Sequence, residues 1–120
     1  RNPLNHMSIM MRKDDVLRIG SYRHIPYIED YELWVRAMIN GIRIGNIGEV
    51  LVHARIGNGM VQRRGTKKYI KSWHLMNKDM IKAGMIGYAP YARNMISIIA
   101  FVFMPVRLKG VLYKKVLRKG

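Results

Sequence analysis

Cysteine is absent from this chain of 120 residues. The protein therefore has no disulfide framework, no thiolate nucleophile and no thiolate metal site, which fits a reducing compartment. The sequence also lacks a glycine-rich phosphate-binding loop, and it has no apolar run of the roughly 20 residues that a membrane-spanning helix needs. What remains is a chain long enough for one domain with a modest core.

Acidic residues are scarce, and their distribution is uneven. The chain has seven Asp and Glu against 22 Lys and Arg, so its formal net charge is +15. Residues 61–120 hold fourteen of the basic residues and a single acidic residue, Asp79. Such an excess of one sign in one half of a chain indicates an anionic partner for that half, such as nucleic acid, a membrane surface or phosphate groups.

Three of the seven acidic residues lie within four positions, at the start of a predicted helix of about three turns. Gly41 follows this helix, at a position that favours a residue tolerating the left-handed conformation. An apolar stripe is expected to pack inwards, with a polar face opposite it. The stripe consists of Leu33, Trp34, Ala37 and Met38, and the polar face consists of Glu32, Arg36 and Asn40.

Asp30, near the start of this helix, has two interpretations. It can cap the helix, because Asp is among the preferred residues at that position. Alternatively, the helix end keeps its carboxylate ionised and directed into a cleft. Glu29 and Asp30 cannot form a glycosidase pair, because adjacent side chains diverge while a retaining pair must face each other about 5 Å apart. If Asp30 takes part in chemistry, it acts alone as a base.

Other segments show simpler patterns. Short apolar or alternating runs predict strands at residues 7–11, 42–47 and 50–55. Helical spacing predicts a short helix at 13–19, ended by a glycine, and a long basic helix at 61–83.

Two segments near the C-terminus have an open interpretation. Residues 95–106 are almost entirely apolar, and residues 111–119 form a basic amphipathic stretch. The apolar run is either a core helix or, together with the basic tail, a segment that binds an anionic membrane surface.

Four blocks of sequence, in this order, resemble the C-terminal part of bacterial family 2 glycosyltransferases. The resemblance covers roughly residues 1–65. The blocks are Arg1-Asn2-Pro3-Leu4-Asn5-His6-Met7; Gly20-Ser21-Tyr22; Glu29-Asp30-Tyr31-Glu32-Leu33-Trp34-Val35-Arg36 with Gly41 and Asn46-Ile47; and Val52-His53-Ala54-Arg55-Ile56-Gly57 with Met60, Arg63 and Arg64.

The resemblance implies an α/β fold. Residues 1–60 would be the acceptor part of a nucleotide-diphospho-sugar transferase (GT-A, Rossmann-like) domain, and residues 61–120 a basic helical extension. The implied reaction transfers a sugar from a nucleotide-diphospho-sugar to an acceptor hydroxyl with inversion, in the synthesis of cell-surface polysaccharide or glycolipid. The implied location is cytoplasmic, at the inner face of the cell membrane.

Residue roles also follow from the resemblance. Asp30 takes the position of the catalytic base, and Glu29 that of a residue that shapes the acceptor site. Trp34 either lines that site or belongs to the core, where a Trp on an apolar helix face is usually found. The candidates for binding the donor diphosphate are His6, Arg55, Arg63 and Arg64, and His6 is also a candidate metal ligand.

One departure from the family pattern is the absence of its Asp-x-Asp signature. We therefore expect a divalent metal, Mg or Mn, only in the full enzyme, and we expect the chain alone to be inactive. The alternative functions are a basic nucleic-acid-binding module and a membrane-peripheral interaction module. The acidic cluster at 29–32 argues against nucleic acid, because carboxylates repel phosphates.

Overall fold

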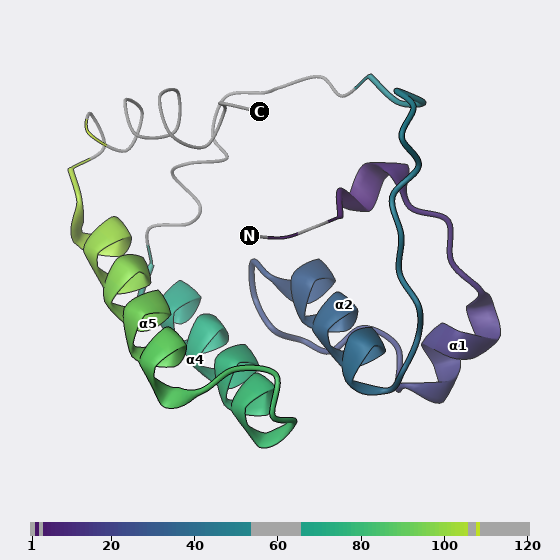
Figure 1. Ribbon diagram of the computed structural model, residues 1–120. Coiled ribbons are helices and arrows are strands. Elements are labelled where there is room, and N and C mark those ends of the chain that lie inside the picture. Colours follow the sequence, from purple (N-terminus) through teal and green to yellow (C-terminus); the bar gives the residue numbers. More distant parts are fainter. Residues whose placement is uncertain (1, 3, 54–65, 106–107, 109–120) are drawn as a thin grey trace.

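The computed structural model describes residues 2, 4–53, 66–105 and 108. A short 3-10 helix, η1, spans His6–Ser8, and it is followed by α1 at Lys13–Arg18 and α2 at Glu29–Ile39. Two longer helices come next, α4 at Lys67–Lys82 and α5 at Tyr88–Phe103 (Figure 1). Throughout these described ranges, every regular element is a helix.

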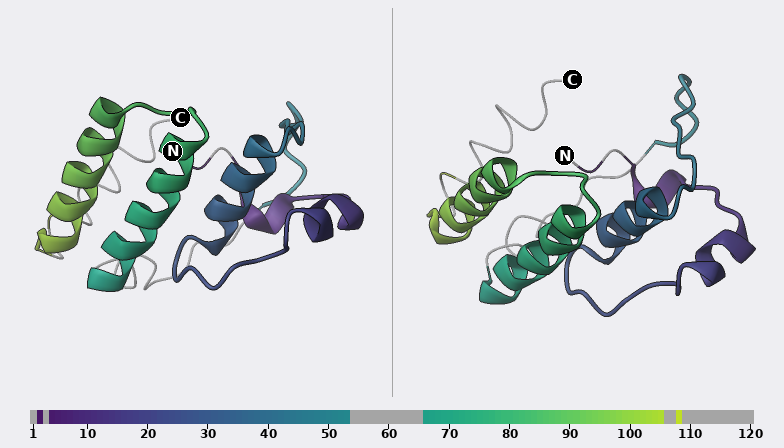
Figure 2. Two further views of the ribbon diagram at one scale, coloured as in Figure 1. Left: turned by 90° about the horizontal axis from the view of Figure 1, so that it is seen from below. Right: turned by 60° about the horizontal axis from the view of Figure 1, so that its bottom comes forward.

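Helix α2 is the centre of the structure. In both views of Figure 2 it lies between α1 on one side and α4 on the other, with α5 outermost beyond α4. Each side has its own apolar cluster. One cluster joins α2 to α4 and α5 through the buried residues Ile28, Val35, Tyr69, Met76 and Val102. The other joins α2 to the N-terminal part through Ile19, Leu33, Trp34 and Ala37.

The predicted α/β fold is wrong for the described part of the chain, which contains no strand and no sheet. Residues 9–11 and 42–47, expected as strands, have no regular structure, and residues 7–8 belong to η1. Residues 50–53 are also irregular, and the last two positions of that predicted strand lie outside the described residues. A strand needs a neighbouring strand to take up its backbone N–H and C=O groups, and the described residues offer these segments none.

The alternation at residues 42–47 has a different physical basis. Ile42 and Ile44 are half-buried and pack against the cluster of Leu33 and Trp34, while Arg43 between them is exposed. The alternation of apolar and polar residues therefore arises because one side of the segment faces the core. It does not report hydrogen bonding to a partner.

Local chemistry explains where the helices end. Gly20 and Gly41 have positive φ values of 85° and 73°, which side chains with a Cβ rarely adopt. After α1, Ser21 donates its backbone N–H to the carbonyl of Val16, and after α2, Ile42 donates to that of Ala37, both at 2.9 Å. These are the long bonds of a Schellman motif, so the helix ends predicted at both glycines are confirmed.

Helices α4 and α5 correspond to the predicted basic helix and apolar run. α4 begins at Lys67, capped by the side chain of Thr66, which accepts from the backbone N–H of Tyr69. The first residues of that predicted helix, 61–65, lie outside the described residues. α5 begins at Tyr88, before the apolar run, because Pro90 falls in its first turn, where no backbone donor is needed. None of the helices in the described ranges is long and apolar enough to cross a membrane.

A buried amide takes part in the packing of α4 against α5. Asn77 of α4 is fully buried; its side-chain amide donates to the carbonyl of Trp73 and accepts from Asn94 of α5. The predicted division between residues 60 and 61 lies outside the described residues and stays a prediction.

Candidate functional site

Asp30 lies in the first turn of α2. The helix begins at Glu29, and its N-cap is Ile28, so the interpretation of Asp30 as the cap is wrong. The Asp30 side chain is half-buried, and its Oδ2 accepts a hydrogen bond of 3.3 Å from the side-chain amide of Asn2. Glu29 beside it is exposed. Both carboxylates thus lie at the end of α2 where backbone N–H groups without intrahelical partners and the positive end of the helix dipole attract negative charge.

His6 belongs to a small polar and aromatic group close to α2. Its Nε2 lies 2.8 Å from the hydroxyl of Tyr22, and its ring centroid lies 6.2 Å from the ring of Trp34. Trp34 follows Asp30 by four positions, so the two share a face of the helix. The structure therefore brings His6 and Trp34 together on the side of α2 that carries Asp30.

Trp34 is a core residue. It is 4% exposed and packs with Leu33 and Ala37, as its position on the apolar stripe predicts. Its indole Nε1 is buried and has no hydrogen-bond partner among the described groups. A residue this deeply buried can pack against the ring of His6, but it offers little surface to a ligand.

A hollow of about 460 Å³ lies beside the start of α2. Glu29 and His6 belong to its wall, so the structure brings together these two residues that the sequence placed in different roles. The remaining wall comes from the loop before α2: Tyr22, Arg23, His24, Ile25, Pro26 and Tyr27. Aromatic faces with a few hydrogen-bonding groups are the usual lining of a small-molecule site.

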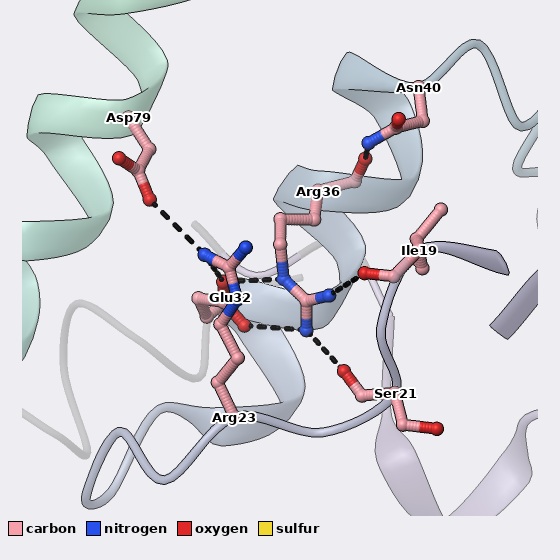
Figure 3. A network of polar contacts seen from close by, with 7 residues as sticks. All are labelled: Ile19, Ser21, Arg23, Glu32, Arg36, Asn40 and Asp79. Atoms are coloured by element: carbon pink, nitrogen blue, oxygen red, sulfur yellow. Dashed lines mark hydrogen bonds and ion pairs between the residues drawn. The ribbon is translucent and has the colours of Figure 1, made fainter. Parts of the chain in front are cut away.

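Glu32 and Arg36 form a buried ion pair, which corrects the prediction that they lie on a polar outer face of the helix. Glu32 is 1% exposed and Arg36 5%. Arg36 Nε lies 2.6 Å from Glu32 Oε1, and Nη2 lies 2.9 Å from Oε2 (Figure 3). The other hydrogen bonds of the guanidinium go to the backbone carbonyls of Ile19 and Ser21.

This network fixes the loop that forms the wall of the hollow. Arg36 holds the loop at its start, through the carbonyls of Ile19 and Ser21. Arg23 lies 3.4 Å from Glu32 and 3.7 Å from Asp79 of α4, so the same network reaches the basic helix (Figure 3). The spacing of Glu32 and Arg36 is that of a helical ion pair. That spacing could have revealed the pair but not its burial, because the covering loop comes from outside the helix.

The remaining predicted residues are not placed. Arg55, Arg63 and Arg64 lie outside the described residues. Within the part of the chain that is described, no group of three or more His, Asp or Glu side chains is arranged to hold a metal ion.

Burial raises the pKa of Tyr31, which follows Asp30.

Comparison with known proteins finds relatives that are named as glycosyltransferases. Over 119 residues the chain is 34% identical to the UDP-Gal:alpha-D-GlcNAc-diphosphoundecaprenol beta-1,3-galactosyltransferase of Escherichia coli, covering 99% of this chain and 43% of that protein. It is 37% identical to the amylovoran biosynthesis glycosyltransferase AmsE of Erwinia amylovora, over 100% of this chain and 45% of that protein. An uncharacterized glycosyltransferase of Haemophilus influenzae is 33% identical, over 99% and 44% respectively.

No family model and no solved structure matches the chain. The chain spans less than half the length of each curated relative that it matches. The similarity nevertheless extends through α4 and α5, well beyond the first 65 residues, where the sequence motifs lie. The chain is therefore homologous, over essentially its whole length, to a segment of bacterial glycosyltransferases.

Proposed function

We propose that this chain is the acceptor-side segment of an inverting glycosyltransferase, which moves a sugar from a nucleotide-diphospho-sugar to an acceptor hydroxyl. The observation that supports this most directly is the setting of Asp30, a half-buried carboxylate in the first turn of a helix. The residue before it, Glu29, lines a hollow together with His6. The relatives' names support sugar transfer in the synthesis of a surface polysaccharide or glycolipid.

In this proposal Asp30 is the general base. Its carboxylate accepts the proton of the acceptor hydroxyl as that oxygen bonds to the anomeric carbon and the bond from this carbon to the nucleoside diphosphate breaks. One carboxylate oxygen accepts a hydrogen bond from Asn2, which orients the side chain, and in this proposal the other oxygen receives the proton. Glu29 contributes to the acceptor site, in keeping with its place in the wall of the hollow.

The donor side of the reaction involves other residues in this proposal. His6, Arg55, Arg63 and Arg64 are the candidates for the diphosphate, because guanidinium groups match phosphate oxygens. A divalent metal, Mg or Mn, belongs to the full enzyme in this proposal, and His6 alone is too few ligands to hold it. We expect the isolated chain to have no transferase activity, because it lacks an Asp-x-Asp motif.

The test is Asp30→Asn in the full-length protein. We expect turnover to fall by roughly 10²–10⁴, the usual contribution of a positioned base, with the protein still folded. The matched control is Asp14→Asn, at an exposed Asp in the first turn of α1, which should leave turnover unchanged. Near-normal turnover in the Asp30→Asn variant, at saturating donor and acceptor, would contradict the assignment.

We also propose that the helical part binds the anionic inner face of the cell membrane, which places the protein in the cytoplasm. On α5 an apolar surface remains uncovered, at Tyr88, Ile96, Ile99 and Phe103. The neighbouring α4 carries exposed lysines at 67, 68, 71, 78 and 82. Apolar side chains beside positive charge are what an anionic lipid surface attracts. No comparable observation favours nucleic acid.

Sedimentation with liposomes tests this second proposal. Vesicles that contain acidic lipid should bind the chain, and binding should weaken as salt rises, because the screening length falls from about 10 Å at 0.1 M to 3 Å at 1 M. Replacing Ile96 and Phe103 by Ser should reduce binding, while Leu75→Ser on α4 serves as the control. Equal binding to neutral and acidic vesicles would contradict the proposal.

A further inference from the structure

The loop at residues 20–27, which forms most of the hollow, has an unusual backbone. Besides Gly20, two residues with side chains have positive φ, Ser21 at 53° and Tyr27 at 73°. For a residue as bulky as Tyr this conformation is an outlier, and surrounding contacts must hold it in place. Such outliers gather at ligand sites, and Tyr27 is part of the wall of the hollow.

Helix α4 supplies those contacts. The ring of Tyr27 packs edge-on against Tyr69 of α4, with ring centroids 6.2 Å apart. Tyr69 in turn packs on Trp73 at 6.1 Å, within the interface of α2 and α4. A second connection comes from Asp79 of α4, which lies 3.7 Å from Arg23 in the same loop. The basic helix therefore holds the loop at both its middle and its end.

The chemistry of the hollow suits a neutral ring that carries hydroxyl groups. Tyr22 and Tyr27 supply aromatic surface, and His24 and Glu29 supply hydrogen-bonding groups. The face of an aromatic ring is electron-rich and attracts polarised C–H groups, which sugar rings expose on one face.

The same hollow is poorly suited to a nucleotide diphosphate. Among the described residues of its wall, Arg23 supplies the one guanidinium, and this group already lies beside the carboxylates of Glu32 and Asp79. The carboxylate of Glu29 would also repel phosphate oxygens. Of the two substrates of a sugar transfer, the acceptor is therefore the one that fits.

We propose that Tyr27 is a specificity-determining residue for the acceptor sugar, and that Tyr69 and Asp79 of α4 position it. This inference depends on the proposed transferase function, because that function supplies the acceptor. It adds a contribution from α4, a helix beyond the segment that carries the sequence motifs.

The test is binding of small probes to the full-length protein, measured by ligand-observed NMR titration. The probes are the methyl pyranosides of glucose, galactose and N-acetylglucosamine, with UDP as a probe for the donor side. The main variant is Tyr27→Gly, because glycine adopts a φ of 73° without strain while the whole side chain, ring included, is removed. The controls are Tyr27→Phe, which keeps the ring, and Tyr88→Ala, at a Tyr of α5 that is 78% exposed.

We expect Tyr27→Gly to weaken the binding of the preferred pyranoside about fivefold to tenfold, the loss of one aromatic contact. Tyr27→Phe, Tyr88→Ala and UDP binding should remain close to wild type. An unchanged pyranoside affinity in Tyr27→Gly overturns the proposal. So does a loss of UDP affinity in that variant, or a wild-type protein that binds none of the pyranosides.

Two further variants test the role of α4 and the role of Asp30 separately. Asp79→Asn should weaken pyranoside binding slightly, and it should add nothing when Tyr27 is already Gly, because a positioning residue acts through the residue it positions. Additive effects would overturn the role of α4. Asp30→Asn should bind pyranosides like wild type while losing turnover. If Asp30→Asn keeps its turnover, the proposed catalytic function fails, and the result for Tyr27 still stands or falls by its own measurement.

Discussion

Arg36 uses all three of its guanidinium nitrogens on groups inside the protein, and this makes it a sensitive residue for stability. It neutralises the buried carboxylate of Glu32 and binds the carbonyls of Ile19 and Ser21. Both charges of such a buried pair lose their hydration when the protein folds, and this cost offsets much of the attraction between them. Removing one partner alone, however, leaves an uncompensated charge in the interior.

We therefore predict that Arg36→Met lowers the free energy of unfolding by about 3–5 kcal/mol. The matched control is Arg18→Met, because Arg18 pairs with Asp15 at 2.8 Å with a side chain that is 61% exposed, and such a pair contributes at most about 1 kcal/mol. Urea denaturation monitored by circular dichroism measures both. Adding Glu32→Leu to the Arg36→Met variant should restore part of the loss. Equal effects of the two Met substitutions would show that the Glu32–Arg36 pair is not buried in solution.

Tyr31 gives a prediction for alkaline pH. Burial raises the pKa of its hydroxyl above the ordinary value of 10.0, so the unfolded chain releases this proton at a lower pH than the folded chain. Stability associated with Tyr31 is thus fully present below pH 10 and is lost as pH rises from there through the folded-state pKa. Tyr31→Phe has no proton to lose. Its unfolding free energy should fall less steeply than that of wild type above pH 10, and parallel profiles would contradict this expectation.

At the scale of single elements, the end of α2 depends on one backbone conformation. Gly41 has a φ of 73°, and no atom lies within 4 Å of the place where a Cβ would be. Gly41→Ala should therefore cost about 1 kcal/mol through backbone strain alone, without a steric clash. Gly45→Ala is the matched control, since its Cβ would also meet open space and its φ is not positive. Similar thermal unfolding midpoints for the two variants would show that α2 does not need this ending.

The elements also show which features the sequence could predict. The ends of α1 and α2 were predictable because a glycine in the left-handed conformation is a local requirement. The position of Asp30 was not, because Asp is favoured both at the N-cap and in the first turn, and only the observed start at Glu29 separates the two. The burial of Arg36 depends on carbonyls at residues 19 and 21, and a helical pattern contains no information about them.

At the scale of the whole molecule, the sequence predicted the positions of the long helices but wrongly predicted a sheet. The basic and apolar segments form α4 and α5, as expected from their spacing. The strands were predicted from alternation and from the family resemblance, yet alternation at Ile42 and Ile44 reflects contact with the core alone. Pairing between strands requires a partner elsewhere in the chain, and in the described residues there is none. The sequence motifs indicated Glu29, which lies in the wall of the hollow, but they did not indicate Tyr27, which packs against Tyr69 of α4.

The position of α2 between two apolar clusters has a consequence for amide hydrogen exchange. Six consecutive residues, 32–37, are buried, so their N–H groups are covered from both sides. The cluster of Ile19 and the cluster of Val102 must both come apart before these amides meet water. Deuterium should therefore enter the middle of α2 only through global unfolding. Its rate there should rise both with Ile19→Ala and with Val102→Ala, in proportion to the stability that each substitution removes, although the two residues lie on opposite sides of the helix.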